Sequence, residues 1–202
     1  MIYKKLVLFF IAMLFSLYLY PQEYKVGSII KDFKLLDVTG KTVSLSDYKN
    51  AKGFIIVFTS NTCPFSKLYE ERLNKLSLKY QQTGFPVIVI NANDPAMQPG
   101  ESFDNMKLKA EEKQFVFPYL FDEGQKVTTL FYPLKTPHAF VVTRESNNYK
   151  IVYSGAIDDS PSNAATVKVN FVENAVDELL AGKKVSISTS KPIGCTVKWK
   201  KG

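Results

Sequence analysis

One stretch of the sequence constrains the fold more than any other: an apolar run, a helical pattern and a second apolar run. The two runs, Phe54–Phe58 and Phe85–Ile90, contain no polar residue. Such runs are expected of strands that are buried on both faces of a mostly parallel sheet. Between them, apolar residues recur at helical spacing, at Tyr69, Leu73, Leu76 and Tyr80. The unit predicts two parallel strands joined by a right-handed helical crossover, as in α/β folds.

The rest of the chain adds elements around this unit. The 202 residues are expected to form one main domain, and no linker divides them. We expect a signal peptide or N-terminal anchor at 1–22, the domain at 23–183, and a C-terminal tail at 184–202. Within the domain we predict a hairpin over 33–45, helices over 106–113 and up to 131, strands at 138–143 and 149–153 joined by a turn at 144–148, and a helix over 164–180.

The N-terminus has the pattern of a targeting segment. Lys4 and Lys5 precede an uncharged apolar run from Leu6 to Tyr20, which is 20 − 6 + 1 = 15 residues. That length is typical of a signal peptide and is short for a membrane span of about 20 residues. No small-x-small cleavage triplet precedes Pro21, so a cleaved signal and a retained anchor both stay open. Either predicts a protein that is periplasmic, secreted, or anchored facing outside the cytoplasm.

Composition excludes several classes of protein. With two cysteines and one histidine, the chain cannot form a zinc finger or a dense disulfide scaffold, and we predict no cofactor and no metal site. The formal net charge of +7 is spread along the chain. Its densest group, Lys198, Lys200 and Lys201, is typical of a solvated terminus, so we do not expect a nucleic-acid partner.

Cys63 lies where chemistry is most expected. It follows the first buried strand and precedes Pro64, a residue that fits the first position of a helix. Unpaired amides and the helix dipole favour an anion there, so the pKa of a thiol falls from about 8.5 toward about 3.5 to 7.5. We expect Ser66 and the helix amides to donate to this thiolate.

Several motifs together are similar to one known family. The motifs are Asn61-Thr-Cys-Pro-Phe-Ser-Lys67, Ile90-Asn-Ala-Asn-Asp94, Phe117-Pro-Tyr-Leu-Phe-Asp122, Thr136-Pro137 and Ile193-Gly-Cys-Thr-Val-Lys-Trp199. They resemble peroxiredoxin-like redoxins of the thioredoxin superfamily, related to alkyl hydroperoxide reductase and thiol-specific antioxidant proteins, over roughly 26–199. The resemblance implies a thioredoxin-like fold with a central mixed sheet flanked by helices, an N-terminal hairpin and a C-terminal tail. It also implies that Cys63 is the redox-active thiol and that Pro137 is a cis-proline facing it.

The sequence departs from the family in ways that bear on activity. Ser66 replaces the second cysteine of a Cys-x-x-Cys pair, so Cys63 has no local resolving partner. The proline and threonine that typical peroxiredoxins place before their cysteine are replaced by Ile56 and Ser60. Their peroxide-orienting arginine is not matched by Arg144, which falls in a predicted turn. Cys195 is then a possible resolving thiol, and the segment 185–191 before it, without predicted regular structure, could let it move.

These observations predict an exported thiol-dependent oxidoreductase. Cys63 would attack a disulfide or a peroxide, with Ser66, Thr136, Pro137 and Cys195 completing the site. Its partners would be a thiol reductant with a client protein disulfide or a small peroxide, and residues 1–22 could anchor it to a membrane. The alternative is a non-enzymatic thioredoxin-like binding module in which Cys63 is inert or structural. His138 is expected to be an ordinary strand residue, and the polar residues Asn91, Asn93 and Asp94 are expected to form a turn.

Overall fold

A computed structural model describes residues 24–201 of the protein. The predicted signal peptide or anchor at 1–22 lies outside the described residues. Within residues 24–201, no helix is long and apolar enough to cross a membrane.

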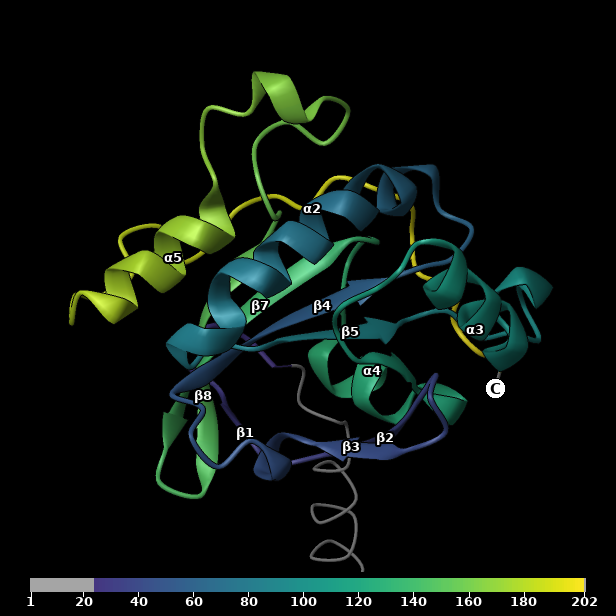
Figure 1. Cartoon of the computed structure of the whole chain (residues 1–202), viewed down its shortest axis with the longest axis horizontal. Coiled ribbons are helices and arrows are strands. Elements are labelled where there is room, and N and C mark those ends of the chain that lie inside the picture. Colours follow the sequence, from purple (N-terminus) through teal and green to yellow (C-terminus); the bar gives the residue numbers. More distant parts are fainter. Residues whose placement is uncertain (1–23, 202) are drawn as a thin grey trace, which may run out of the picture.

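The described residues form a curled mixed sheet with helices on both faces (Figure 1). Its strands follow the order β1-β8-β7-β4-β5-β6-β2-β3. The strands are β1 (Ile29–Ile30), β2 (Lys34–Asp37), β3 (Thr42–Ser44), β4 (Gly53–Thr59), β5 (Val87–Asn91), β6 (Tyr119–Phe121), β7 (His138–Glu145) and β8 (Asn148–Gly155). The α-helices are α2 (Pro64–Tyr80), α3 (Phe103–Glu112), α4 (Lys126–Phe131) and α5 (Phe171–Leu180). Short 3-10 turns cover Leu45–Asp47, Gln81–Thr83, Pro99–Glu101, Glu123–Gln125 and Ala164–Thr166.

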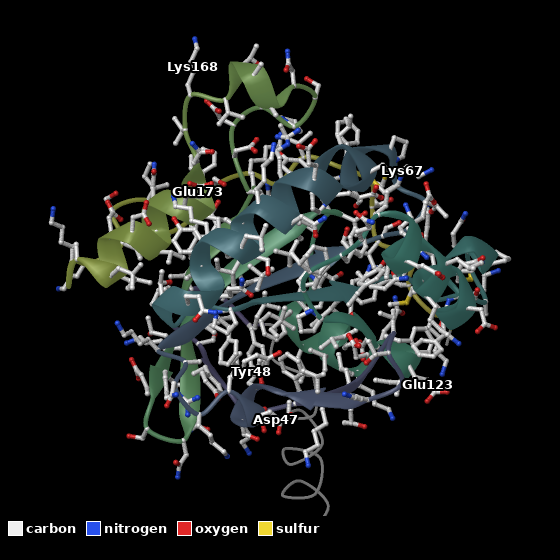
Figure 2. All side chains as sticks on the ribbon, viewed as in Figure 1. Asp47, Tyr48, Lys67, Glu123, Lys168 and Glu173 are labelled. Atoms are coloured by element: carbon white, nitrogen blue, oxygen red, sulfur yellow. The ribbon has the colours of Figure 1, made fainter. Side chains whose placement is uncertain are left out.

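Strand β4 is the centre of two hydrophobic cores. Ile55 and Val57 face the core beneath α2 and α5, whereas Phe54, Ile56 and Phe58 face the core that contains α4. This two-sided burial explains why the sequence of β4 is apolar without alternation. β4 and β5 are parallel, which confirms the predicted strand-helix-strand unit and, with the antiparallel pairs elsewhere, the mixed sheet. Side chains fill the space between the sheet and its helices, while Lys168 and Glu123 lie on the outside (Figure 2).

Several predicted elements have different bounds, and α3 begins at Phe103 instead of residue 106. The last helix begins at Phe171 instead of residue 164, because the chain before it is tied to a loop: the Asp159 carboxylate accepts from the amide of Lys168, and the Asp159 amide donates to the carbonyl of Val169. The turn expected at 144–148 is shorter, since β7 continues to Glu145 and β8 begins at Asn148. Arg144 therefore lies in a strand and not in a turn.

The tail packs against the domain instead of hanging free. It passes the start of α2 (Figure 1), Val197 is buried in the core that contains α4, and Trp199 stacks on Tyr132 with ring centroids 5.1 Å apart. Within 185–191, which we expected could let Cys195 move, Ser190 is hydrogen-bonded to the end of β8 and the residue after it. Its hydroxyl accepts from the Ala156 amide at 2.9 Å, and its own amide donates to the Ser154 carbonyl at 3.2 Å.

Candidate active site

Cys63 stands at the junction of β4 and α2. The loop Ser60–Thr62 leads from the strand, Cys63 is the N-cap of the helix, and Pro64 takes the first helical position. Proline is tolerated there because its missing N–H would be unpaired in any case. Only 3% of the Cys63 surface is exposed, so the sulfur lies beneath other groups. The local sequence thus places the thiol as expected, at a helix N-terminus.

The Thr136-Pro137 segment, just before β7, lies directly against this sulfur. The peptide bond between the two residues is cis, which confirms the prediction made from the sequence. The Cys63 Sγ lies 3.1 Å from the carbonyl oxygen of Thr136, within hydrogen-bond reach of the thiol. Both residues are buried, so one wall of the site is a fixed piece of backbone.

Cys195 completes the cluster from the far end of the chain. Its Sγ lies 2.7 Å from the Sγ of Cys63, and both cysteines are free. Its backbone pairs with Thr136 in an antiparallel bridge, with Thr136 N to Cys195 O at 2.8 Å and Cys195 N to Thr136 O at 3.2 Å. Gly194 permits this contact, because a Cβ built there would stand 2.0 Å from the Thr136 carbonyl oxygen. A residue 132 positions away in sequence is thereby brought onto the Cys63 sulfur.

Ser66 lies next to Cys63 but acts through its backbone. Burial of Cys63 opposes ionisation, but hydrogen bonds led by those from the Cys195 thiol and the Ser66 backbone amide outweigh it, so the pKa of Cys63 is lowered. The buried hydroxyls of Ser66 and Thr136 have no hydrogen-bond partner among the described residues. We expected Ser66 itself to donate, and its amide does so while its hydroxyl stays unpaired.

The two thiols differ sharply in their readiness to ionise. Burial raises the pKa of Cys195 to about 11, and the hydrogen bond to Cys63 and the charge of that sulfur act in the same direction. The nearby charges of Lys198 and Lys135 oppose this rise. When the pair loses one proton, the negative charge is therefore favoured on Cys63 and the remaining proton on Cys195.

A sequence profile of the AhpC/TSA family matches residues 26–152, which is more than half of the chain. The chain belongs to the AhpC/TSA family. The resemblance inferred from the motifs is thereby confirmed, and with it the thioredoxin-like, thiol-disulfide oxidoreductase-like class of redoxin. A relative with an assigned activity is the thiol-disulfide oxidoreductase ResA of Geobacillus thermodenitrificans, 26% identical over 127 residues, which are 63% of this chain and 68% of the relative.

Two solved structures resemble this AhpC/TSA protein along almost its whole length. An uncharacterised conserved protein from Geobacillus kaustophilus is 35% identical with a TM-score of 0.80, covering 90% of this chain and 95% of that one. A hypothetical protein from Sinorhizobium meliloti is 33% identical with the same TM-score, covering 90% and 98%. The peroxidoxin BcpB of Mycobacterium tuberculosis, 18% identical with a TM-score of 0.55 over 79% of this chain and 96% of its own, shares the fold.

A buried carboxylate that we did not predict anchors the Cys63 loop of this AhpC/TSA protein. Glu101 is fully buried and accepts from the Ser60 hydroxyl at 2.6 Å and the Asn61 amide at 2.7 Å. It also accepts from the amide and hydroxyl of Thr62 and from the side chain of Asn93. The Ser60 hydroxyl in turn accepts from the Cys63 amide at 3.1 Å. A lone glutamate after Pro-Gly carries no distinctive sequence signal, so only the structure identifies it.

A second polar group holds the tail in place. The Asn93 side-chain oxygen accepts from the Lys198 amide at 2.8 Å, and the Asp94 amide donates to the Lys198 carbonyl at 2.9 Å. The buried side chain of Gln125 donates to the same carbonyl at 3.0 Å and accepts from the Lys200 amide at 2.7 Å. Asn91 is the last residue of β5 and not part of a turn as expected, whereas Asn93 and Asp94 lie in the loop after it and also bind the tail that carries Cys195.

Other polar residues lie outside the cluster. His138 is buried in β7, where its ring accepts from the Leu134 amide and contacts the Ser154 hydroxyl, and burial lowers its pKa to about 4. The Arg144 guanidinium donates to the carbonyls of Ala51 and Tyr48, so it does not serve Cys63. Within residues 24–201, no cluster of three His, Cys, Asp or Glu side chains could hold a metal.

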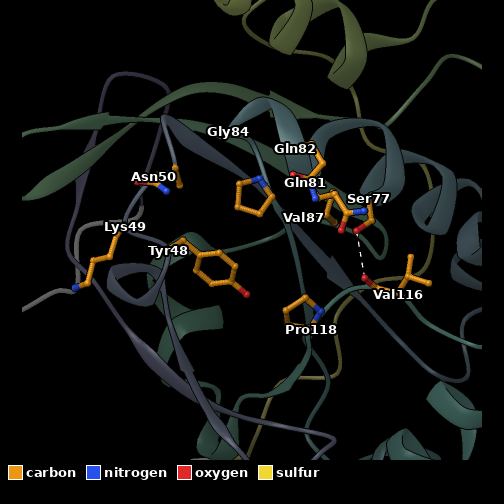
Figure 3. A pocket seen from close by; sticks show the side chains of 12 residues that line it. Tyr48, Lys49, Asn50, Ser77, Gln81, Gln82, Gly84, Val87, Val116 and Pro118 are labelled. Carbon is orange, nitrogen blue, oxygen red and sulfur yellow. Dashed lines mark hydrogen bonds between the residues drawn. The ribbon is translucent and has the colours of Figure 1, made fainter.

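The groove in Figure 3, of about 580 Å³, lies away from the thiols. Tyr48, Pro118 and Val116 line it together with Ser77 near the C-terminal end of α2 and Gln81 just after it. Cys63 is at the opposite end of this 17-residue helix, about 25 Å away at 1.5 Å of rise per residue. This groove therefore does not border the two thiols.

Proposed function

We propose that this protein is an exported thiol-dependent oxidoreductase in which Cys63 attacks a disulfide or a peroxide and Cys195 resolves the product. The observation that carries the proposal is the 2.7 Å separation of the two sulfur atoms, with one of the thiols prepared to ionise. A disulfide bond of about 2.04 Å needs only a small further approach. The class of the AhpC/TSA relatives supports the same chemistry.

With a disulfide substrate, two exchange steps balance the reaction. The Cys63 thiolate attacks R–S–S–R, forms a mixed disulfide and releases one RS⁻. The Cys195 sulfur then attacks the Cys63 sulfur, the Cys63–Cys195 disulfide forms, and the second R thiolate leaves with the proton from Cys195. Two electrons pass from the protein to the substrate, and an external thiol reductant must return them.

With a peroxide, the Cys63 thiolate attacks one oxygen of ROOH, and ROH leaves after protonation. The Cys63 sulfenic acid then reacts with the Cys195 thiol to give the same disulfide and one water. In both cases the negative charge on Cys63 is lost in the first step. The part of the raised Cys195 pKa that this charge causes then disappears, so Cys195 becomes a better nucleophile when it is needed.

Three further residues take supporting roles in this proposal. The Ser66 amide donates to the Cys63 thiolate, and the unpaired buried hydroxyls of Ser66 and Thr136 could accept from or donate to an oxygen or sulfur that substrate brings. Pro137 fixes the backbone that faces Cys63. None of these roles requires a cofactor.

Export is part of the proposal because of the N-terminal pattern. The basic pair Lys4 and Lys5 and the apolar run after it would direct the chain across a membrane, and the segment would then be removed or retained as an anchor. Cell fractionation with an epitope at the C-terminus tests this. A full-length soluble cytoplasmic protein would contradict it.

The catalytic part is tested by turnover of hydrogen peroxide and of bis(2-hydroxyethyl) disulfide, each with dithiothreitol as reductant. We expect the wild type to turn over at least one of them and Cys63→Ser to turn over neither. Cys195→Ser should still lose its Cys63 thiol to the oxidant but form no intramolecular disulfide by mass spectrometry. If Cys63 reacts no faster than a free cysteine, the non-enzymatic binding module is the better description.

A further inference from the structure

The C-terminal tail of this protein is hydrogen-bonded to the backbone beside the Cys63 sulfur. Thr136 offers one N–H and one C=O next to Cys63, and both are paired with Cys195, at 2.8 Å and 3.2 Å. The tail thus lies as a short antiparallel strand whose cysteine sulfur is 2.7 Å from Cys63. Antiparallel pairing with exposed backbone is a general way for proteins to hold an extended polypeptide without reading its sequence.

We propose that the segment 193–195 occupies the place where an extended polypeptide would bring its own cysteine to Cys63, so that the enzyme acts on small disulfides or peroxides. The inference rests on the proposed function, because it assumes that Cys63 is the attacking thiol. Small disulfides and peroxides are then the substrates, and Gly194 is the residue that restricts the site to them.

The close approach of Gly194 makes the occupancy exclusive. A Cβ at this position would stand 2.0 Å from the Thr136 oxygen and 2.7 Å from the Thr136 carbonyl carbon, and backbone atoms cannot turn aside as a side chain can. A second chain cannot share this space with the tail. An extended substrate must therefore displace the tail before its backbone can pair with Thr136.

The tail is a strong competitor for this place. A segment tethered to the same molecule has an effective concentration of the order of millimolar. The tail is held further by the hydrogen bonds of Lys198 with Asn93, Asp94 and Gln125 and by the buried side chain of Val197. An external peptide at micromolar concentration is therefore outcompeted by about a thousandfold.

A small substrate avoids this competition. It needs no backbone pairing, and the side chain of Cys195 is partly exposed, so a rotation of that side chain can open a path to Cys63 while the tail stays paired. A disulfide or peroxide without a polypeptide backbone can then react directly.

The test compares two substrates that contain the same reactive bond. One is the mixed disulfide of thionitrobenzoate with N-acetylcysteine methyl ester, and the other is its mixed disulfide with the central cysteine of an extended octapeptide. Attack by the Cys63 thiolate forms a bond to the cysteine sulfur and releases coloured thionitrobenzoate. Rates are measured in Cys195→Ser, whose tail keeps its backbone pairing, and in the same protein carrying Gly194→Ala.

We expect Gly194→Ala to raise the ratio of the peptide rate to the small-substrate rate by at least about tenfold. An octapeptide N-methylated at the amides flanking its cysteine should not show this gain, because it cannot pair with Thr136. Gly182→Ala, at a glycine with open space around it, controls for a general loss of stability and should leave the ratio unchanged.

Hydrogen exchange at the backbone amide of residue 195 shows whether the tail has left Thr136. A released tail with an unchanged ratio overturns the inference, and so does a tail that stays protected in Gly194→Ala, since the exclusive fit would then be wrong. If no variant releases thionitrobenzoate from either substrate, the proposed attack by Cys63 fails instead, which is a separate result.

Discussion

Replacing Glu101 by glutamine removes the negative charge on which the Cys63 loop is built. One carboxylate oxygen accepts from the Ser60 hydroxyl, from the backbone N–H and hydroxyl of Thr62, and from the side-chain NH₂ group of Asn93. The other oxygen accepts from the backbone N–H of Asn61. Glutamine offers one oxygen and one NH₂ group. In its best orientation the oxygen keeps the first set of donors, and the NH₂ group faces the N–H of Asn61.

The loss of stability follows from this mismatch. A buried N–H without an acceptor costs about 1–3 kcal/mol, and hydrogen bonds to a charged group are worth about 1.5–3 kcal/mol against about 1 kcal/mol for neutral ones. Relief from burying an ionised group offsets part of the loss. We therefore expect Glu101→Gln to lower the free energy of unfolding by about 2–4 kcal/mol at pH 7.

The loss of unfolding free energy in Glu101→Gln also depends on pH. Burial opposes ionisation of Glu101, but hydrogen bonds from Ser60, Thr62, Asn61 and Asn93 outweigh it, so the pKa of Glu101 is lowered from its ordinary 4.5. Its contribution to stability is complete above the unfolded-state pKa and is lost as pH falls through the lower, folded-state pKa. The difference between wild type and Glu101→Gln should thus be full at pH 7 and shrink below about pH 4.5.

Urea unfolding at pH 7 and at a series of pH values below 4.5 measures both effects. Glu111→Gln, an exposed carboxylate on α3, is the matched control and should leave the midpoint unchanged. The reasoning is refuted if Glu101→Gln loses less than about 0.5 kcal/mol, or if its loss is the same at every pH.

Three other changes probe the thiol pair and the core. Cys195→Ala removes a donor to the Cys63 sulfur and should raise the pKa of Cys63, which the pH dependence of iodoacetamide alkylation reports; an unchanged profile would contradict the assigned hydrogen bond. Gln125→Asn keeps a residue that tolerates the left-handed backbone at this position (φ 56°), but its side chain is too short to hold the tail. It should lower the equilibrium constant for forming the Cys63–Cys195 disulfide in a glutathione buffer by about tenfold, because each lost hydrogen bond is worth about 0.5–1.5 kcal/mol. An unchanged equilibrium constant would show that the tail needs no such support. His138→Gln removes a ring whose pKa burial lowers to about 4. As pH falls, the unfolded state takes up a proton on the His138 ring before the folded state does. The wild type should therefore lose stability between about pH 6.5 and 4, and the variant should lack this loss. Urea midpoints of the two proteins that run parallel over that range would disprove it.

The sequence was sufficient for the parts of the fold that have a local pattern. β4 and α2 were predictable because two-sided burial gives an unbroken apolar run and one-sided burial gives helical spacing. The position of Cys63 followed from its place between them. The last helix was predicted too early, because Val167 fits helical spacing although Asp159 holds the preceding chain in a loop.

The polar supports of the site could not be predicted in this way. Glu101 meets the loop at Ser60 across 41 residues, and Asn93 meets Lys198 across 105. Such contacts depend on how distant segments meet in the folded chain, so they produce no repeating pattern in the sequence. The lack of a second cysteine near Cys63 made Cys195 a candidate, but the distance between its sulfur and that of Cys63 depends on the bridge to Thr136 and is a property of the tertiary structure alone.

The stack of Trp199 on Tyr132 gives the protein an intrinsic optical reporter. Trp199 is the chain's one tryptophan, it follows Cys195 by four residues, and its indole lies nearly parallel to the tyrosine ring, at an interplanar angle of 19°. Emission excited selectively from tryptophan therefore comes from the tail and from nowhere else in the chain. A shift in its wavelength or intensity would report release of the tail, as expected for Gly194→Ala, without any label.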